Sequence, residues 1–324
     1  MKAIKSLIAY HDKCIDGFTS AYIAHKYILT YRQEVPETIA MSYTQASEAM
    51  LGAALAKEEY LNLYVVDFSL SLEFLEYLNK TYPILQIFIL DHHKSALEKY
   101  LPHTDLRTLE PEKLLCFDLE QFNNVKLICS LYMSGAHIVH NYFYGHRDVP
   151  NIVMLVEDYD LWKFQYGDKT KQIHQLLMAA DKSFEEWERL TNLLQNPEEA
   201  DKLFKQGKKL LESFTDKVAE YVSNASVITL WRGNDYYDVP AVACPPEFAS
   251  AVGNELAKTT EFFGVTFSLV SEKGHHLIKW SLRSVGDFDV AKFASYFAGG
   301  GHKNAAGFTT LFEGGMNNAF LGSK

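Results

Sequence analysis

Apolar and polar residues alternate with two different periods through the first part of the chain. Short apolar runs at Ser6–Tyr10, Leu61–Val66 and Ile84–Leu90 have the length and composition of buried strands. Between these runs, apolar residues recur at helical spacing, as in Gly17–Tyr31 and Leu72–Lys80. This alternation predicts βαβ units that share a parallel sheet.

Helical patterns dominate the middle of the chain, and the pattern changes again near the end. Asn124–Tyr144 is expected to form one long helix, and several more helices are expected within Lys171–Ser223. After them, a hairpin of Glu261–Val270 with Leu277–Arg283 should precede a helix at Asp289–Phe297. These last elements indicate a smaller α/β domain.

The length of the chain also favours two domains, because 324 residues exceed what one hydrophobic core usually holds. We predict an α/β fold with an N-terminal parallel-sheet lobe at residues 1–195 and a smaller C-terminal α/β lobe at residues 226–324. A helical connector at residues 196–225 would join the two lobes.

The composition is that of a soluble globular protein, with 48% hydrophobic and 22% charged residues. No apolar stretch approaches the ~20 residues of a membrane span, and the first apolar run is too short for a signal peptide. The four cysteines are widely spaced and form no CxxC pair, which argues against disulfides and structural zinc. A cytoplasmic protein without a membrane partner is therefore expected.

The net charge of −10 bears on the class of ligand. Proteins hold long nucleic acids mainly by neutralising phosphates with Lys and Arg, so this balance argues against a long polymer. A short phosphorylated substrate stays compatible, since bound metal ions can supply local positive charge.

Three polar clusters directly follow three of the predicted strands, at His11–Gly17, Asp67 and Asp91–His93. The carboxyl ends of parallel strands share one edge of a sheet, so these side chains should converge in space. One acid after a strand usually only caps a helix. Three clusters that together contain three histidines and four aspartates are harder to explain as caps.

Carboxylates and imidazoles together suit Mn²⁺, with Mg²⁺, Fe²⁺ or Co²⁺ as alternatives. Two such ions about 3.5–4 Å apart can hold both the attacking and the leaving oxygen of a phosphoryl displacement. The set is too rich in carboxylates for structural zinc. A further acidic group, Glu157–Asp160, follows the apolar run Ile152–Val156, although it could also be a solvated turn.

These motifs resemble those of the DHH family of phosphoesterases. A DHH triplet alone has little specificity, but here a GGGH motif of one family branch follows it about 210 residues later. The matching segments are Asp91–His93 for the triplet, His11–Gly17, Asp67 and Asp158 for the first, second and fourth motifs, and Gly299–Phe308 for the GGGH motif.

The resemblance implies a two-lobed phosphoesterase with its active site in the cleft and two metal ions on the N-terminal lobe. Asp67 would bridge the ions, and a hydroxide between them would be the nucleophile. His93 would face the scissile phosphate or position a ligand, and Asp91 would orient a ligand. The implied metal ligands are His11, Asp16, Asp67, His92 and Asp158.

The resemblance also implies substrate-binding residues in the C-terminal lobe, which would close over the substrate. The backbone of Gly299, Gly300 and Gly301 would approach a phosphate together with His302. Arg283 would reach a phosphate or carboxylate of the substrate. A flexible turn is the alternative for the three glycines.

Two positions leave alternatives open. Many family members carry a second Asp two residues before the Asp of the Asp-Gly pair, where this chain has Cys14. A thiol there could change the choice of metal, weaken one metal site, or simply pack against the sheet edge. Asp160 could also replace Asp158 as the ligand.

The resemblance favours hydrolysis of phosphodiester or phosphomonoester bonds in short nucleotides. The C-terminal domain is similar to that of nano-RNases (oligoribonucleases), cyclic dinucleotide phosphodiesterases and 3′-phosphoadenosine 5′-phosphate phosphatases. A pyrophosphatase or polyphosphatase is one alternative, and a nucleotide-binding regulatory protein with an impaired site is another. A monomer and a homodimer are both compatible with the sequence.

Overall fold

The computed structural model describes residues 5–12, 14–106, 113–146, 148–272 and 275–312. The chain divides into two compact units, Met1–Leu211 and Glu212–Lys324. The division falls inside helix α9 (Pro197–Ser223), which lies in the segment expected to form a helical connector. In the described parts of the chain, no helix is both long and apolar enough to cross a membrane.

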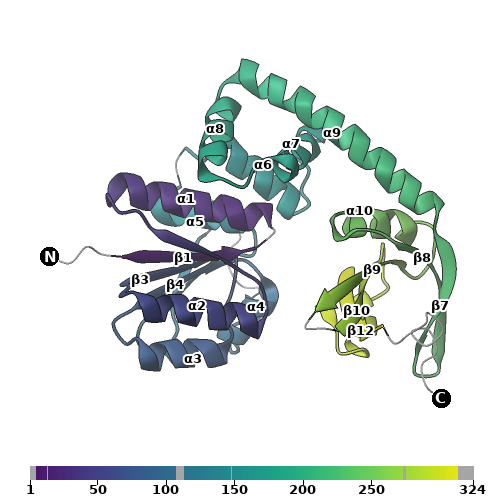
Figure 1. Cartoon of the computed structure of the whole chain (residues 1–324), viewed down its shortest axis with the longest axis horizontal. Coiled ribbons are helices and arrows are strands. Elements are labelled where there is room, and N and C mark those ends of the chain that lie inside the picture. The colour runs from purple at the N-terminus through teal and green to yellow at the C-terminus, as the bar shows by residue number, and fades with distance from the viewer. Residues whose placement is uncertain (1–4, 13, 107–112, 147, 273–274, 313–324) are drawn as a thin grey trace. The chain divides into compact units, whose positions relative to one another are not determined.

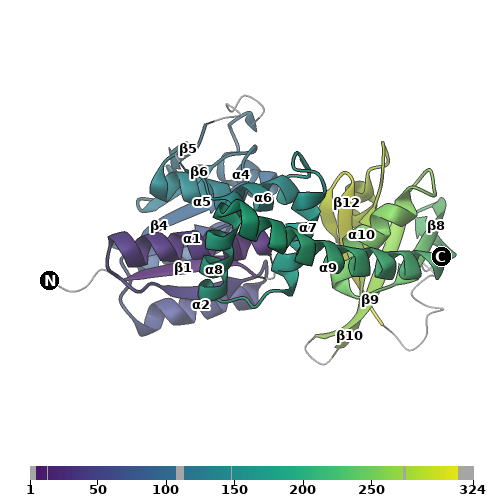
Figure 2. The same ribbon diagram turned by 90° about the horizontal axis from the view of Figure 1, so that it is seen from above.

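Unit 1 is built on a six-stranded sheet with the order β2-β1-β3-β4-β6-β5 (Figures 1 and 2). All neighbouring strands pair in parallel except β5, which runs antiparallel to β6 at one edge. The expected parallel-sheet lobe is thereby confirmed. The strands are β1 (Ser6–His11), β2 (Glu37–Met41), β3 (Asn62–Val66), β4 (Gln86–Asp91), β5 (Leu115–Asp118) and β6 (Val125–Cys129).

Helices cover both faces of this sheet, because alternate strand residues point to opposite sides. Leu63 and Val65 pack in a core with α2, α3 and α4, whereas Tyr64 and Val66 pack in a second core with α1 and α5 to α8. Figure 1 shows α2 and α3 on one side of the sheet and α1 and α5 on the other. The helices are α1 (Ile15–Tyr31), α2 (Gln45–Lys57), α3 (Leu72–Thr81), α4 (Lys94–Tyr100), α5 (Gly135–Tyr144), α6 (Asn151–Asp160), α7 (Asp168–Ala179) and α8 (Phe184–Gln195).

The prediction of one helix over Asn124–Tyr144 is wrong. Its first part is strand β6, which pairs with β4 and β5, and a new helix, α5, begins only after Ser134. The side chain of Ser134 caps that helix by accepting a hydrogen bond from the backbone N–H of His137. A short apolar run such as Val125–Cys129 does not distinguish a buried strand from a buried helix, which explains the error.

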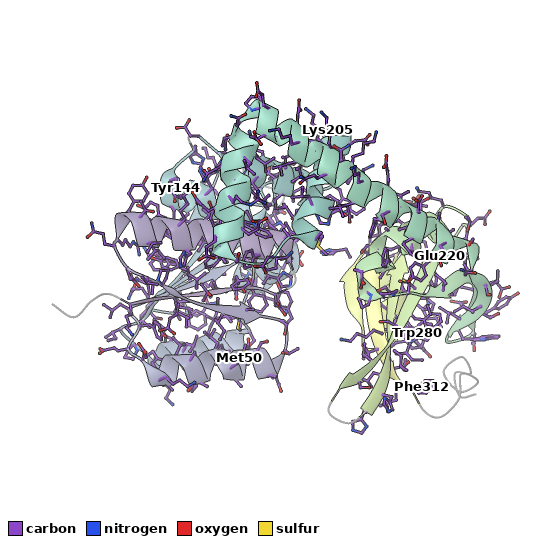
Figure 3. All side chains as sticks on the ribbon, turned by 45° about the horizontal axis from the view of Figure 1, so that its top comes forward. Met50, Tyr144, Lys205, Glu220, Trp280 and Phe312 are labelled. Atoms are coloured by element: carbon purple, nitrogen blue, oxygen red, sulfur yellow. The ribbon has the colours of Figure 1, made fainter. Side chains whose placement is uncertain are left out.

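Unit 2 contains a second six-stranded sheet, with the order β11-β12-β10-β9-β8-β7 and helices α10 (Pro246–Ala257) and α11 (Val290–Ser295). The expected hairpin is present as β9 and β10; its tip, Lys273–Gly274, lies outside the described residues. Trp280, labelled in Figure 3, is buried in this unit's core. The strands are β7 (Ser226–Arg232), β8 (Asp235–Ala243), β9 (Gly264–Glu272), β10 (His275–Arg283), β11 (Gly300–His302) and β12 (Ala305–Leu311).

Candidate metal centre

The polar clusters of unit 1 meet at the carboxyl edge of its parallel sheet. His11 ends β1, Asp67 directly follows β3, and Asp91 ends β4. The three strands are neighbours in the order β1-β3-β4, so their ends lie side by side. Two helices add further carboxylates: Asp16 lies in the first turn of α1, and Asp160 is the last residue of α6.

His92 lies among three carboxylates. Its Nε2 atom is 3.2 Å from Oδ1 of Asp67, 3.5 Å from Oδ2 of Asp160 and 3.8 Å from Oδ2 of Asp16. Burial would lower the pKa of His92, but these carboxylates, Asp67 foremost, raise it to about 10. The carboxylates around His92 therefore favour its protonated form.

Asp67 is the central residue of the site. Its side chain is 1% exposed, and neither carboxylate oxygen accepts a hydrogen bond within the described part of the chain. Oδ1 faces His92, and Oδ2 lies 3.5 Å from Nδ1 of His11, which is also buried without a hydrogen-bond partner there. Leaving buried polar groups unpaired is unfavourable, so these atoms fit a cation that would bind between them.

Among the described residues, the donor atoms form three overlapping groups, each with all its atoms within 4.8 Å of one another. Asp67 and His92 each belong to two of them, and the bridging role of Asp67 stays a prediction. Imidazole, carboxylate and thiolate donors together suit divalent transition metals. The groups are His11 with Cys14 and Asp67, Asp67 with His92 and His93, and Asp16 with His92 and Asp160.

Backbone groups hold the carboxylate of Asp16 in place. Asp16 accepts hydrogen bonds from the N–H groups of Gly135 (2.6 Å) and Ala136 (2.9 Å) at the positive N-terminus of α5. Even so, burial and the charge of Asp67 hold the pKa of Asp16 well above its usual value. For Asp67 burial also raises the pKa, but His11 and His92 outweigh that effect and the net pKa lies below the usual value.

Two glycines allow backbone segments to pack closely against the metal centre, Gly135 against Asp67 and Gly17 against His11. Only Gly17 belongs to a motif noted in the sequence. A Cβ atom on Gly135 would lie 2.6 Å from Cβ of Asp67 and 2.8 Å from its Oδ1. A Cβ atom on Gly17 would lie 2.5 Å from the carbonyl oxygen of His11. Gly135 was not predicted from the sequence; the Ser-Gly pair at the start of α5 is the signal that could have identified it.

Asp91 orients its neighbours. It is fully buried and accepts hydrogen bonds from the backbone N–H of His92 (2.8 Å), from Nδ1 of His93 (2.7 Å) and from the hydroxyl of Ser69. Burial would lower the pKa of His93, but its bond to Asp91 raises it. These contacts match the orienting position expected of Asp91, while the role of His93 towards a substrate stays a prediction.

Among the described residues, the groups of possible metal donors contain Asp160, the alternative that the fourth motif left open, and not Asp158. Oδ1 of Asp158 accepts a bond from Gln165 N–H (2.8 Å), and its Oδ2 accepts bonds from Tyr166 N–H (3.2 Å) and the hydroxyl of Thr170. Two residues of a helix that are two positions apart point to nearly opposite sides, so only one of them can face the sheet edge. The sequence could not show which one.

Cys14 precedes α1 and makes no side-chain capping bond. The structure places its sulfur among the donors, within reach of His11 and Asp67. Burial, together with the charges of Asp67 and Asp16, raises the pKa of the thiol well above its usual value. A metal bound there would have to displace the thiol proton.

The residues predicted to bind substrate lie in unit 2. Arg283 and His302 lie at the same level of the sheet, on either side of β12. Both pair with Ala305, Arg283 from β10 and His302 from β11. Arg283 donates a hydrogen bond to the hydroxyl of Ser250 (2.8 Å), and burial lowers the pKa of its guanidinium.

The three glycines of the GGGH motif do not form a free turn. Gly300 and Gly301 belong to β11, and a Cβ atom on Gly299 would lie 2.3 Å from the carbonyl oxygen of Gly307. Phosphate binding by this segment stays a prediction.

No family model matches the sequence. Uncharacterized protein R106 of Acanthamoeba polyphaga mimivirus is 27% identical over 311 residues, which cover 93% of this chain and 66% of that protein. The chain thus spans slightly less than two thirds of this relative.

Solved structures give further similarities. The crystal structure of exonuclease RecJ bound to manganese has a TM-score of 0.52 at 14% identity, covering 98% of this chain and 88% of that chain. A pGpG-specific phosphodiesterase, PggH from Vibrio cholerae, has a TM-score of 0.44 at 9% identity, covering 95% and 94%. The similarity to RecJ shows a shared fold.

Replacement of Asp67 by Asn should remove metal binding while the fold is kept, because the amide preserves the shape but removes the charge that both imidazoles face. We expect Mn²⁺ affinity to fall by at least about 10-fold, measured by titration calorimetry. Asp118→Asn, at an exposed site on β5, is the matched control. Unchanged metal affinity in Asp67→Asn would contradict the central position of this residue.

Asp158 and Asp160 should respond differently to the same substitution. Asp160→Asn is expected to lower Mn²⁺ affinity with little change in stability. Asp158→Asn should lower the free energy of unfolding by about 2 kcal/mol, since a charged hydrogen-bond acceptor is lost. Urea unfolding and metal titration of both variants test this, and the reverse result would restore Asp158 as the ligand.

Cys14→Asp should shift the choice of metal, because thiolate favours softer ions and carboxylate favours harder ones. We expect the ratio of Mn²⁺ to Zn²⁺ affinity to rise in this variant, measured by competition between the two ions. Cys116→Asp, at an exposed cysteine, controls for the general effect of the substitution. An unchanged ratio would mean that Cys14 only packs at the sheet edge.

Proposed function

We propose that the protein is a metal-dependent phosphoesterase that hydrolyses phosphodiester or phosphomonoester bonds of short nucleotides. The observation that carries the proposal is the buried carboxylate of Asp67, whose two oxygens face His92 and His11 at a sheet edge. This carboxylate and the two imidazoles offer donor atoms that divalent cations would bind. A site of this kind suits phosphoryl chemistry with two metal ions.

The proposed ligands divide around Asp67 into two sets. His11 and Cys14 form one group with Asp67, and Asp16, His92 and Asp160 form another. We propose Mn²⁺ as the ion, with Mg²⁺, Co²⁺ and Fe²⁺ as alternatives. When bound, the ions would lower the pKa of a water molecule and polarise a phosphoryl oxygen.

The remaining residues of the site would act on the substrate. Nδ1 of His93 is held by Asp91 at 2.7 Å, so the opposite ring nitrogen, Nε2, is the one that can contact a phosphoryl oxygen. Burial of Asp91 and its bonds from three neighbouring groups keep the ring in one orientation. His93 is thus proposed to position the phosphate and to hold a proton against it.

Two further observations support the substrate class. The fold is shared with exonuclease RecJ, whose structure is described as bound to manganese. The net charge of −10 disfavours long polymers, which rely on many Lys and Arg contacts. Arg283, Gly299, Gly300, Gly301 and His302 remain the proposed substrate-binding residues of unit 2.

Purified protein with Mn²⁺ should release mononucleotides from a dinucleotide or a short oligoribonucleotide, or phosphate from 3′-phosphoadenosine 5′-phosphate. Chelation should abolish the activity, and added Mn²⁺ should restore it. At equal concentrations of RNA ends, long single-stranded RNA should be cleaved more slowly than a short oligoribonucleotide. Product analysis by chromatography measures all of these reactions.

Other outcomes of this screen would overturn the proposal. Phosphate release from pyrophosphate alone would indicate a pyrophosphatase. Tight nucleotide binding without turnover would indicate a regulatory protein. His93→Asn supplies a matched variant, because we expect it to lower kcat while the metal content stays that of the wild type.

A further inference from the structure

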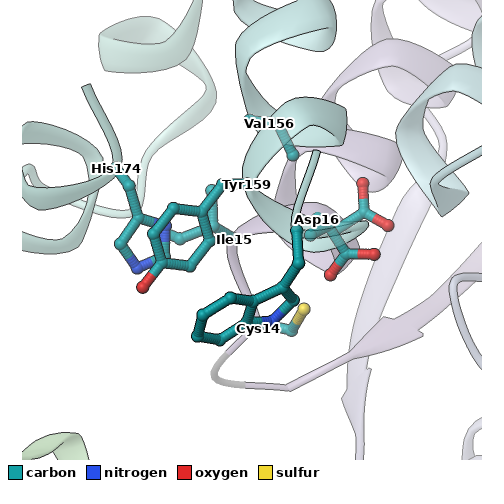
Figure 4. Close-up of a pocket in the computed structure, with 8 residues that line it drawn as sticks. Cys14, Ile15, Asp16, Val156, Tyr159 and His174 are labelled. Atoms are coloured by element: carbon teal, nitrogen blue, oxygen red, sulfur yellow. The ribbon is translucent and has the colours of Figure 1, made fainter. Parts of the chain in front are cut away.

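A pocket of about 130 Å³ lies beside the metal centre, within unit 1 (Figure 4). Residues of the metal centre line one part of it, and an aromatic group lines another. The two sets are Cys14, Asp16 and Asp160 for the metal centre, and Tyr159, Trp162 and His174 for the aromatic group.

Two rings form a flat stack in this pocket. The ring centroids of Tyr159 and His174 are 3.4 Å apart, and the ring planes differ by 5° (Figure 4). Burial, with a smaller effect of Lys182, lowers the pKa of His174 to about 4, so the imidazole is neutral near pH 7. The stack is therefore an uncharged planar surface next to a strongly acidic site.

Trp162 is presented to solvent by a constrained turn. Its side chain is 60% exposed, and its φ of 53° lies in the left-handed region that bulky residues rarely adopt. Phe164 has a φ of 48° and packs edge-on against the indole, with ring centroids 5.4 Å apart. Strained backbone of this kind is found mainly where the surrounding structure holds a residue for a purpose.

Asp158 holds that turn in place. Its backbone carbonyl accepts bonds from the N–H groups of Lys163 (3.0 Å) and Phe164 (3.3 Å). Its carboxylate accepts bonds from Gln165 and Tyr166, just beyond the strained residues. The buried Asp158 thus holds the turn that contains Trp162, although the indole of Trp162 is largely exposed and its burial contributes little to stability.

We infer that Trp162, Tyr159 and His174 form a binding site for the nucleobase next to the phosphate under attack. This inference rests on the proposed function and specifies its substrate class further. A planar uncharged base can stack on aromatic rings, whereas its negatively charged phosphate would be drawn to the adjacent cations. Stacking tolerates every base, so the site should bind purines and pyrimidines without strict preference.

Binding of adenosine 5′-monophosphate and of ribose 5-phosphate in the presence of Mn²⁺ tests the inference, measured by titration calorimetry. The two probes share the phosphate and the ribose and differ in the base. The wild type should bind adenosine 5′-monophosphate about 10-fold more tightly. Trp162→Ala should remove most of this difference, Trp162→Phe should keep it, and both should bind Mn²⁺ as the wild type does.

Trp231→Ala, at an exposed tryptophan in unit 2, is the matched control and should keep the 10-fold difference. Trp162→Gly repeats the test without backbone strain if the Ala variant does not fold. Equal wild-type affinity for the two probes, or an equal loss for both in Trp162→Ala, would overturn the nucleobase site.

The calorimetric test is independent of turnover, so the two proposals can fail separately. Base-dependent binding without hydrolysis would overturn the phosphoesterase proposal and leave the nucleobase site standing. Hydrolysis of nucleotides with base-independent binding would overturn the nucleobase site alone.

Discussion

The arrangement of unit 1 depends on one unfavourable feature, the buried carboxylate of Asp67 without a hydrogen-bond donor in the described part of the chain. Its strand, β3, lies between β1 and β4, which bring an imidazole to each oxygen. The imidazoles of His11 and His92 stabilise this charge, because they lower the pKa of Asp67. The neighbouring carboxylates are held by other groups: Asp16 accepts bonds from a helix N-terminus, and Asp91 is bonded by His93.

The sequence predicted the parallel sheet and the convergence of His11, Asp67 and Asp91–His93, because both follow from local patterns. Strand period and the polarity at strand ends can be recognised within a few residues, and parallel pairing then brings the ends together. The choice between Asp158 and Asp160 could not be made in this way. It depends on the rotation of α6 about its axis, which is set by packing against the rest of unit 1.

The positions of Asp158 and Asp160 also change how the acidic end of α6 is understood. Asp160 faces His92, while Asp158 braces the turn that carries Trp162. The two acids at the end of α6 thus have different contacts. Asp160 lies at the metal centre, and Asp158 is bonded to the turn that contains Trp162. The acidic motif at Glu157–Asp160, which suggested a metal ligand, therefore also leads to residues that line the pocket beside the metal centre.

Gly135 places a limit on how this centre can vary among related sequences. The N–H groups at the start of α5 reach Asp16 only because no side chain separates the helix from Asp67. A single methyl group at this position would push the helix end away from the strand and break the bonds to Asp16. A loss of activity after Gly135→Ala would then reflect a displaced helix, although the substituted residue contributes no reactive atom of its own.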